Sequence, residues 1–311
     1  MAGIWVYSED TSVLFQLLSI GRVLADGLKE NVGAINLFDD SAAADIVSRG
    51  ADKVVSLTGE SLWAEGYAEA ITEQLAQAEP TVILVGGTLR GKDVAAKIAA
   101  KLKVGLVNSA TDIKVDNGQL VTNRIMYGGL AVCTEELGKG CIVTIDPRTY
   151  EESQADASRT GETVTVAAKI DDRAKMVGDV CPIVRQTADI SEAQKVVCVG
   201  RGVGKQEDMK LAENLAAKLG AEIGCTRSIA EDYHWLPVES YIGLSGAKTK
   251  PELYISFGVS GQIQHVAGIR DSKIIVAIDT NEKAPIFEAA DYGIVGDLYE
   301  IVPLLTEKIA K

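Results

Sequence analysis

Short apolar runs alternate along this chain with longer segments in which apolar residues recur every three or four positions. The short runs predict buried strands, and the longer spacing predicts amphipathic helices. In the first hundred residues the predicted strands cover residues 4–7, 32–38, 53–57 and 81–85, and the predicted helices cover 12–29, 41–49, 61–78 and 91–102. Strands separated by helices in this way predict an α/β fold, a doubly wound parallel sheet with helices on both faces.

The pattern changes after Gly105 and restarts near residue 195. Segments 112–115, 119–124 and 142–145 alternate polar and apolar residues and are separated by Asn-Gly and Gly-Gly pairs, which predicts appended antiparallel strands. Apolar periodicity is weakest over residues 151–192, so we place a domain boundary near residue 185. Beyond it the α/β alternation returns, with strands predicted at 195–199, 253–257 and 273–278 and helices at 206–219 and 298–310. We expect two α/β domains, residues 1–185 and 186–311.

Composition narrows the classes of function. Hydrophobic residues make up 47% of the 311 residues, which is enough to build packed cores. A net charge of −13 argues against a nucleic-acid surface and against adsorption to anionic lipids. With no run of about 20 apolar residues and no basic stretch at the start, we expect a cytoplasmic protein without membrane insertion.

The cysteines favour a reducing compartment and no metal site. None of the five forms a Cys-x-x-Cys pair, which argues against zinc and iron–sulfur centres. An odd, scattered set fits reduced thiols better than a disulfide framework. They are Cys133, Cys141, Cys181, Cys198 and Cys225.

Polar chemistry is most concentrated in the segment 258–265, directly after the predicted strand 253–257. This small-residue turn carries the hydroxyl of Ser260, two amides and His265, one of only two histidines. A strand that leads through such a turn into a helix leaves backbone N–H groups free to bind an anion. The segment therefore suggests a phosphorylated cofactor whose reactive part lies near His265, although a lone histidine on a helix is more often structural.

Other glycine turns match known motifs only in part. The segment 200–204 fits the first two glycines of G-x-G-x-x-G, but Lys205 stands at the third, so a plain strand–helix connection and a cofactor turn remain equally open. The segment 86–92 fits a Walker A loop except that Asp93 replaces the metal-binding hydroxyl, which argues against nucleotide hydrolysis. The segment 258–262 around Ser260 lacks the final glycine of a nucleophile elbow, G-x-S-x-G, which argues against Ser260 as a nucleophile.

Nearly the whole chain resembles the electron transfer flavoprotein alpha subunit, and the specific matches are concentrated in residues 195–302. The matching positions are Leu253-Tyr254-Ile255, Gly258-Val259-Ser260-Gly261, Ile263-Gln264-His265, Gly268, Ile275-Val276-Ala277-Ile278, Ala284-Pro285-Ile286-Phe287 and Ala290-Asp291-Tyr292-Gly293-Ile294-Val295-Gly296-Asp297-Leu298. Two positions depart from the family pattern. Ser256 replaces Ala or Thr, and Asp279 replaces Asn. The resemblance implies that the second domain is a Rossmann-like domain that binds flavin.

The resemblance also assigns cofactor contacts. Those implied for FAD are Arg201, Thr226, Arg227, Ile242, Gly243, Leu244, Ser245, Ser260, Gly261, Gln262, Ile263, Gln264, His265, Asp279, Asp297 and Leu298. Arg227 would lie against the flavin ring, and a donating or protonated His265 would approach the pyrimidine carbonyl, both favouring negative charge on reduced flavin. Leu244 replaces a glutamine, and the carboxylate of Asp279 would accept from ribose hydroxyls but repel a nearby diphosphate. Without the resemblance, Thr226-Arg227 would be interpreted as a helix cap with an exposed arginine and 242–246 as a glycine turn.

The implied function is an FAD-dependent electron carrier with no catalytic residue of its own. It would pair with a beta subunit, accept electrons from a flavin dehydrogenase of the acyl-CoA-linked class in fatty acid or carnitine metabolism, and pass them to a quinone oxidoreductase. The similarity of the Arg-Gly-Lys and Gly-Gly segments points to the bacterial nitrogen-fixation and carnitine branch. Two alternatives stay open: a pyridine-nucleotide-linked oxidoreductase subunit, and a nucleotide-binding protein that has lost its flavin.

Overall fold

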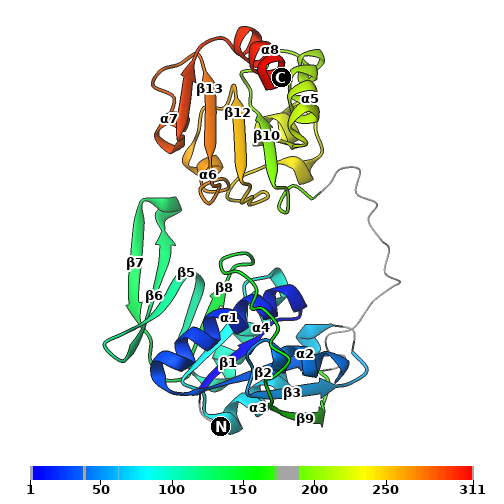
Figure 1. Cartoon of the computed structure of the whole chain (residues 1–311), viewed down its shortest axis with the longest axis vertical. Coiled ribbons are helices and arrows are strands. Elements are labelled where there is room, and N and C mark those ends of the chain that lie inside the picture. The colour runs from blue at the N-terminus through cyan, green and yellow to red at the C-terminus, as the bar shows by residue number, and fades with distance from the viewer. Residues whose placement is uncertain (1–2, 38–39, 62, 172, 174–188, 310–311) are drawn as a thin grey trace. The chain divides into compact units, whose positions relative to one another are not determined.

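The computed structural model describes residues 3–37, 40–61, 63–171, 173 and 189–309 (Figure 1). The chain divides into two compact units. The first comprises residues up to Met126 and Leu130–Val180, and the second includes Cys181–Lys311. The boundary expected at residue 185 lies outside the described residues. Each unit is an α/β layer structure around its own sheet, as the sequence pattern predicts.

The first unit contains a nine-stranded sheet in the order β7-β6-β5-β8-β4-β1-β2-β3-β9. The strands from β5 to β9 in this order pair in parallel, whereas β6 pairs antiparallel with β5 and with β7. The bounds are β1 (Gly3–Tyr7), β2 (Asn31–Leu37), β3 (Lys53–Thr58), β4 (Val82–Gly86), β5 (Leu106–Asp116), β6 (Gln119–Met126), β7 (Ala131–Glu136), β8 (Cys141–Ile145) and β9 (Glu162–Ala167).

The prediction of appended antiparallel strands is correct at one edge of this sheet and wrong for residues 142–145. β5 and β6 form a hairpin whose two-residue turn consists of Asn117 and Gly118. Both residues have positive φ, which a two-residue turn needs in order to match the twist of the two strands. β8 instead lies between β4 and β5 and is parallel to both. All five of its residues are buried, and continuous burial is typical of a strand covered by helices on both faces.

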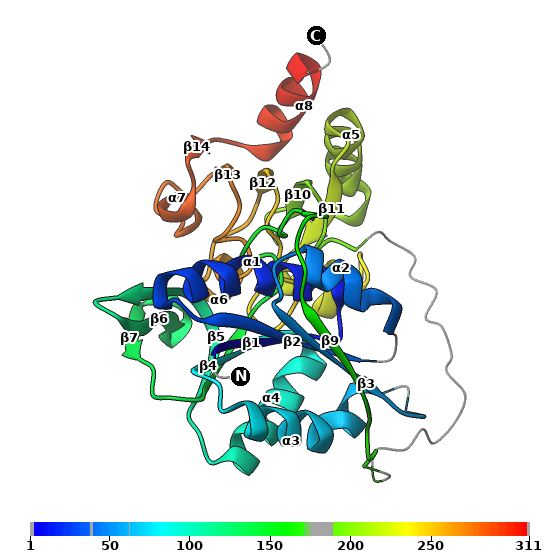
Figure 2. The same ribbon diagram turned by 60° about the horizontal axis from the view of Figure 1, so that its bottom comes forward.

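Helices cover both faces of the first sheet (Figure 2). α1 (Thr11–Leu28) and α2 (Ala43–Ser48) lie on one face, and α3 (Ala68–Ala78) and α4 (Leu89–Leu102) lie on the other, so the sheet separates two apolar cores. The helices predicted at 41–49 and 61–78 are shorter than expected, because 3₁₀ turns at Asp40–Ala42 and Ala64–Tyr67 precede them. Among the described helices only α1 is long and apolar enough to cross a membrane, yet more than half of it is buried within this unit.

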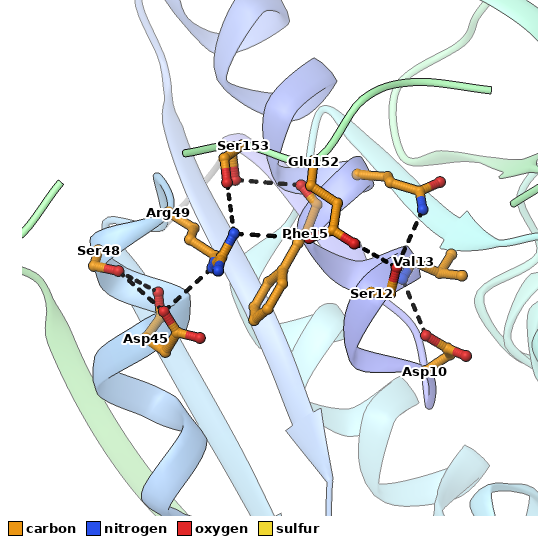
Figure 3. A network of polar contacts seen from close by, with 10 residues as sticks. Asp10, Ser12, Val13, Phe15, Asp45, Ser48, Arg49, Glu152 and Ser153 are labelled. Carbon is orange, nitrogen blue, oxygen red and sulfur yellow. Dashed lines mark hydrogen bonds and ion pairs between the residues drawn. The ribbon is translucent and has the colours of Figure 1, made fainter. Parts of the chain in front are cut away.

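Polar contacts hold the segment after β8 along the surface of α1 and α2 (Figure 3). The Arg49 guanidinium donates to the backbone carbonyl of Ser153 over 2.6 Å and lies 3.9 Å above the ring of Phe15. The Ser12 hydroxyl donates to Glu152, while Asp10 caps α1 by accepting from the amide of Val13. These contacts explain how a stretch with little apolar periodicity runs in a defined path toward β9.

The second unit contains a five-stranded sheet in the order β11-β10-β12-β13-β14, with every pair parallel. β11 and β14 were not among the predicted strands. The strands are β10 (Lys195–Val199), β11 (Glu222–Cys225), β12 (Leu253–Phe257), β13 (Ile275–Asp279) and β14 (Tyr292–Val295), and the helices are α5 (Lys210–Leu219), α6 (Ile263–Val266), α7 (Ile286–Ala289) and α8 (Leu298–Ile309). A 3₁₀ turn at Gln206–Met209 leads into α5, and cores lie on both faces of the sheet.

Candidate functional site

The carboxyl ends of the five parallel strands of the second sheet share one edge, and most of the predicted site residues follow those ends. In open α/β sheets this edge is where ligands bind. The residues that follow or end a strand there are Arg201 after β10, Thr226 and Arg227 after β11, Ser260, Gly261 and Gln262 after β12, Asp279 at the end of β13, and Asp297 and Leu298 after β14.

The turns after β10 and β12 pack backbone against backbone. The amide of Gly202 donates to the carbonyl of Gly258 over 2.9 Å. A Cβ at Gly200 would lie 2.1 Å from the Gly258 oxygen, and one at Gly202 would lie 2.5 Å from the Gly258 Cα. No residue other than glycine fits at these two positions without moving backbone. The segment 200–204 is therefore more constrained than a plain strand–helix connection.

A second glycine fixes the loop 260–264. Gly261 has φ +79°, and a Cβ there would lie 2.2 Å from the amide nitrogen of Ile286 at the start of α7. The same amide donates to the carbonyl of Ser260 over 3.1 Å. With the backbone held in this way, the side chains of the loop remain exposed; they are Ser260, Gln262, Ile263 and Gln264.

Thr226 carries a buried hydroxyl that has no hydrogen-bond partner among the described residues. Its amide donates to the carbonyl of Val199, so the backbone at the end of β11 is anchored to β10. A buried hydroxyl without a partner costs about 1–3 kcal/mol. This residue therefore offers a donor and acceptor to a group that binds at the carboxyl edge, which fits a polar cofactor.

The two predicted arginines are exposed. Arg201 lies in the turn after β10, and Arg227 precedes a π-helical turn at Ser228–Asp232. The Arg227 Nε lies 2.6 Å from a carboxylate oxygen of Glu231, and this hydrogen bond raises the pKa of the guanidinium. Arg227 therefore presents a cation that a carboxylate one turn away already neutralises in part.

The loop 242–246 is attached to α6. The amide of Leu244 donates to the carbonyl of Gln264 over 2.7 Å, and a Cβ at Gly268 would lie 2.7 Å from the nitrogen of Gly243. Ile242 and Gly243 are buried, whereas Leu244 is 54% exposed. The Ser245 hydroxyl lies 3.2 Å from that of Tyr241. Two of the predicted cofactor segments are thus joined to each other.

His265, which we expected to approach the flavin carbonyl, is buried, and both of its ring nitrogens contact other groups of the chain. Its Nδ1 lies 3.0 Å from the carbonyl oxygen of Ile242, and its Nε2 lies 2.7 Å from the hydroxyl of Tyr254. Burial lowers the pKa of the imidazole to about 4, with the bond to Ile242 opposing the shift. Both ring nitrogens therefore have protein partners, and neither is left to donate to a ligand in this conformation.

The remaining predicted residues stabilise the local backbone. Asp279 accepts from the amide of Asn281, and Asp297, which directly precedes α8, accepts from the amide of Tyr299, each over 2.8 Å. Leu298 is buried in the core beneath α8. Each aspartate keeps a second carboxylate oxygen for other contacts.

Three partners of these residues were not predicted from the sequence. The hydroxyl of Tyr299 accepts from the amide of Gly204 over 3.0 Å, which connects α8 to the turn after β10. Tyr254 contacts His265, and Glu231 contacts Arg227. Only Glu231 carries a signal in the sequence, because residues four apart face each other on a helical turn.

The partial Walker A match in the first unit is not free to hold phosphate in this conformation. The Thr88 hydroxyl accepts from the amide of Gly91 and caps α4, and it also contacts a carboxylate oxygen of Glu9. Lys92 lies 2.8 Å from Asp146. The groups that would bind phosphate are thus paired with carboxylates of the chain itself. Within the described part of the chain, no cluster of three or more His, Cys, Asp or Glu residues could hold a metal ion.

Comparison with known proteins identifies the family. Residues 4–171 match the model of the electron transfer flavoprotein domain, and residues 189–270 match that of the electron transfer flavoprotein FAD-binding domain. The chain is 38% identical over 316 residues to Protein FixB of Salmonella typhimurium, covering 100% of this chain and 99% of the relative. It is 37% identical over 314 residues to Protein FixB of Escherichia coli O157:H7, covering 99% and 98%. The chain therefore belongs to the electron transfer flavoprotein family, as an alpha subunit of the FixB branch.

Proposed function

We propose that this chain binds FAD at the carboxyl edge of its second sheet and carries electrons between protein partners. The observation that carries the proposal is the contact between the glycine turns after β10 and β12. At this contact the two turns pack backbone against backbone, with no side chain between them. Bare backbone at a strand-to-helix turn lets a diphosphate approach N–H groups closely. The match of residues 189–270 to an FAD-binding domain supports the same site.

The residues at this edge fit the parts of FAD. Arg201 supplies a permanent cation for the diphosphate, and Arg227 supplies a second cation near the ring. The unpartnered hydroxyl of Thr226 and the exposed hydroxyls of Ser245 and Ser260 supply hydrogen bonds. The free carboxylate oxygen of Asp279 accepts from ribose hydroxyls. FAD, when bound, supplies the capacity to take up and release electrons; these residues bind it and set the charge around it.

Partners follow from the family. We propose that residues 1–185 form the interface with an electron transfer flavoprotein beta subunit and residues 186–311 form the FAD-binding domain. The electron donor would be a flavin dehydrogenase, with acyl-CoA-linked enzymes as the first class to test, and the acceptor a quinone oxidoreductase. The setting would be fatty acid or carnitine metabolism in the cytoplasm.

The test is the visible spectrum of the chain co-expressed with its beta-like partner. We expect flavin absorption bands with about one FAD per heterodimer, and bleaching of those bands when a flavin dehydrogenase and its substrate are added without oxygen. A colourless heterodimer that takes up no added FAD would contradict the proposal and favour a nucleotide-binding protein without flavin. Bleaching by NADH alone would favour a pyridine-nucleotide-linked oxidoreductase.

A further inference from the structure

Three side-chain oxygen atoms near the end of β1 are buried and have no hydrogen-bond partner among the described residues. They are the hydroxyl of Tyr7 and one carboxylate oxygen, Oε2, of each of Glu9 and Glu65. Tyr7 is the last residue of β1 and is 0% exposed, and its side chain packs in the core beneath α3 and α4. Buried polar atoms nearly always have a partner, so these oxygens are suited to a group that the described residues do not supply.

The three oxygens lie together at the start of α4. Oε1 of Glu9 contacts the hydroxyl of Thr88, which caps this helix. Oε2 of Glu65 lies 3.8 Å from a guanidinium nitrogen of Arg90, the second residue of the helix. Burial raises the pKa of the Tyr7 hydroxyl well above its ordinary value, and the negative charges of Glu9 and Glu65 raise it further. Arg90 opposes this rise. Both carboxylates and the guanidinium therefore face the Tyr7 hydroxyl.

The carboxyl ends of β1 and β4 lie where the strand order of the first sheet reverses. From β1 the chain continues to β2 and β3 on one side, whereas β4, β8 and β5 lie on the other. In open α/β sheets, ligands bind at such a switch point. Tyr7 ends β1, and Thr88 follows β4 by two residues. The position of the three oxygens therefore agrees with the place where this type of sheet binds ligands.

The chemistry of the three oxygens favours a hard cation. Two carboxylates repel an anion, and a ligand set made only of oxygen suits Mg²⁺, Ca²⁺ or Mn²⁺. Mg²⁺ keeps several of its waters and is often bound by only one or two carboxylates, which fits the two acidic residues present. The positive end of α4 favours the other oxygen of Glu9, Oε1, and leaves Oε2 for the ion.

Arg90 is the cation of the chain that competes for this place. Its distance of 3.8 Å from Glu65 is too long for a hydrogen bond. Its guanidinium carbon lies 4.1 Å from the centre of the Trp63 ring, and 40% of the side chain is exposed. Arg90 therefore offsets the charge of the two carboxylates only in part, and it should weaken the binding of a second cation.

We propose that the first unit binds a hydrated Mg²⁺ ion through Tyr7, Glu9 and Glu65, at the carboxyl ends of β1 and β4. The ion would connect β1, the 3₁₀ turn at Ala64–Tyr67 and the start of α4. The inference concerns the first unit alone and does not depend on FAD binding in the second.

Mn²⁺ is the probe, because it accepts the same oxygen ligands as Mg²⁺ and its free ion is counted by electron paramagnetic resonance. We titrate MnCl₂ into the heterodimer after removal of metals with EDTA, and then add MgCl₂. We expect a Kd on the order of 1 mM or below and displacement of the bound Mn²⁺ by Mg²⁺. No bound Mn²⁺ at millimolar concentration would overturn the inference and favour a water molecule between the three oxygens.

Charge substitutions of opposite sign locate the ion. We expect Glu9→Gln and Glu65→Gln each to raise the Kd for Mn²⁺ about tenfold or more, because each removes a charged ligand. We expect Arg90→Gln to lower the Kd about threefold, because it removes the competing positive charge. Glu69→Gln is the control, since it makes the same change of charge on α3 at a surface pair with Lys101. A variant that merely unfolds loses affinity, so tighter binding by the Arg90 variant cannot come from damage to the fold.

Tyr7→Phe tests the hydroxyl and keeps the ring in the core. We expect the Kd for Mn²⁺ to rise about threefold, while thermal unfolding without metal shows a protein at least as stable as the unsubstituted one. If Glu69→Gln weakens binding as much as Glu9→Gln and Glu65→Gln do, Mn²⁺ binds the acidic surface in general and the inference fails. An Arg90→Gln protein with unchanged or weaker affinity would overturn it as well.

Discussion

The guanidinium of Arg227 lies 2.6 Å from Glu231, four residues further along the chain. Arg227 is 66% exposed, so this ion pair contributes little to folding. Its effect is on charge at the proposed site, because the carboxylate offsets the cation that would face the flavin. If FAD binds at the proposed site, both residues would set the charge near its ring.

Glu231→Gln tests this offset. We expect the midpoint potential of the flavin to rise by tens of millivolts, since an uncompensated arginine favours the reduced, more negative cofactor. Potentiometric titration of the heterodimer measures this potential. The free energy of unfolding, measured by thermal denaturation, should change by less than about 0.5 kcal/mol. Asp93→Asn is the control, because it breaks the equivalent pair of Asp93 with Lys97 in the first unit. An unchanged potential in Glu231→Gln would argue that Arg227 does not face the flavin.

Thr226→Val distinguishes a hydroxyl that serves a ligand from one that serves the fold. Without FAD, we expect this variant to be more stable by up to about 1 kcal/mol, because valine removes a buried hydroxyl that has no partner. With FAD, we expect the Kd to rise about tenfold. Thr122→Val is matched to it, since Thr122 in β6 also has a buried hydroxyl without a partner. Loss of affinity in the Thr122 variant as well would show that the effect is not local to the site.

Gly200→Ala tests the contact between the two glycine turns. The added methyl would lie 2.1 Å from the carbonyl oxygen of Gly258, so the turns must separate. We expect the free energy of unfolding to fall by about 1–3 kcal/mol and the Kd for FAD to rise. Gly138→Ala is the control, because nothing lies within 4 Å of a Cβ at that position. Urea unfolding and FAD titration of both variants measure the difference, and equal results would remove the contact as the basis of the proposed site.

Stability of the second unit should fall in mild acid because of His265. The folded pKa is about 4, below the ordinary value of 6.5, so the unfolded chain binds the proton first. Stability is therefore greatest above pH 6.5 and is lost as the pH falls from 6.5 to 4, by about 2 kcal/mol at pH 5. Hydrogen exchange of amides in β12 at pH 7.5 and pH 5 measures it. The same shift in His265→Gln would assign the pH dependence to other groups.

Much of the fold could be predicted from the chain, because apolar runs such as 81–85 and 195–199 identify buried strands wherever they lie. The antiparallel orientation predicted for β8 was wrong, because the direction of a strand in a sheet depends on neighbours that are distant in sequence. β9 was missed because none of its residues is fully buried, so no apolar run identifies it. β11 and β14 are only four residues long, which is too short for a periodic signal.

Less of the candidate site could be predicted. The glycine and strand-end positions follow from local pattern and from the family resemblance. The state of His265 does not, because its partners lie 11 and 23 residues away and come together only in the folded sheet. The burial that lowers the pKa of His265 results from the packing of α6, and no sequence motif indicates it.

The pairing of β9 with β3 determines where the first unit can be cut. β9 is the outermost strand beside β3, and about sixteen residues of chain separate it from β8. A shortened chain that stops after Tyr150 would keep most of the apolar core but leave the backbone of β3 unpaired on the side away from β2. Such an open edge recruits strands from other molecules. Expression of the first unit alone should therefore yield soluble protein only when the chain extends past Ala167.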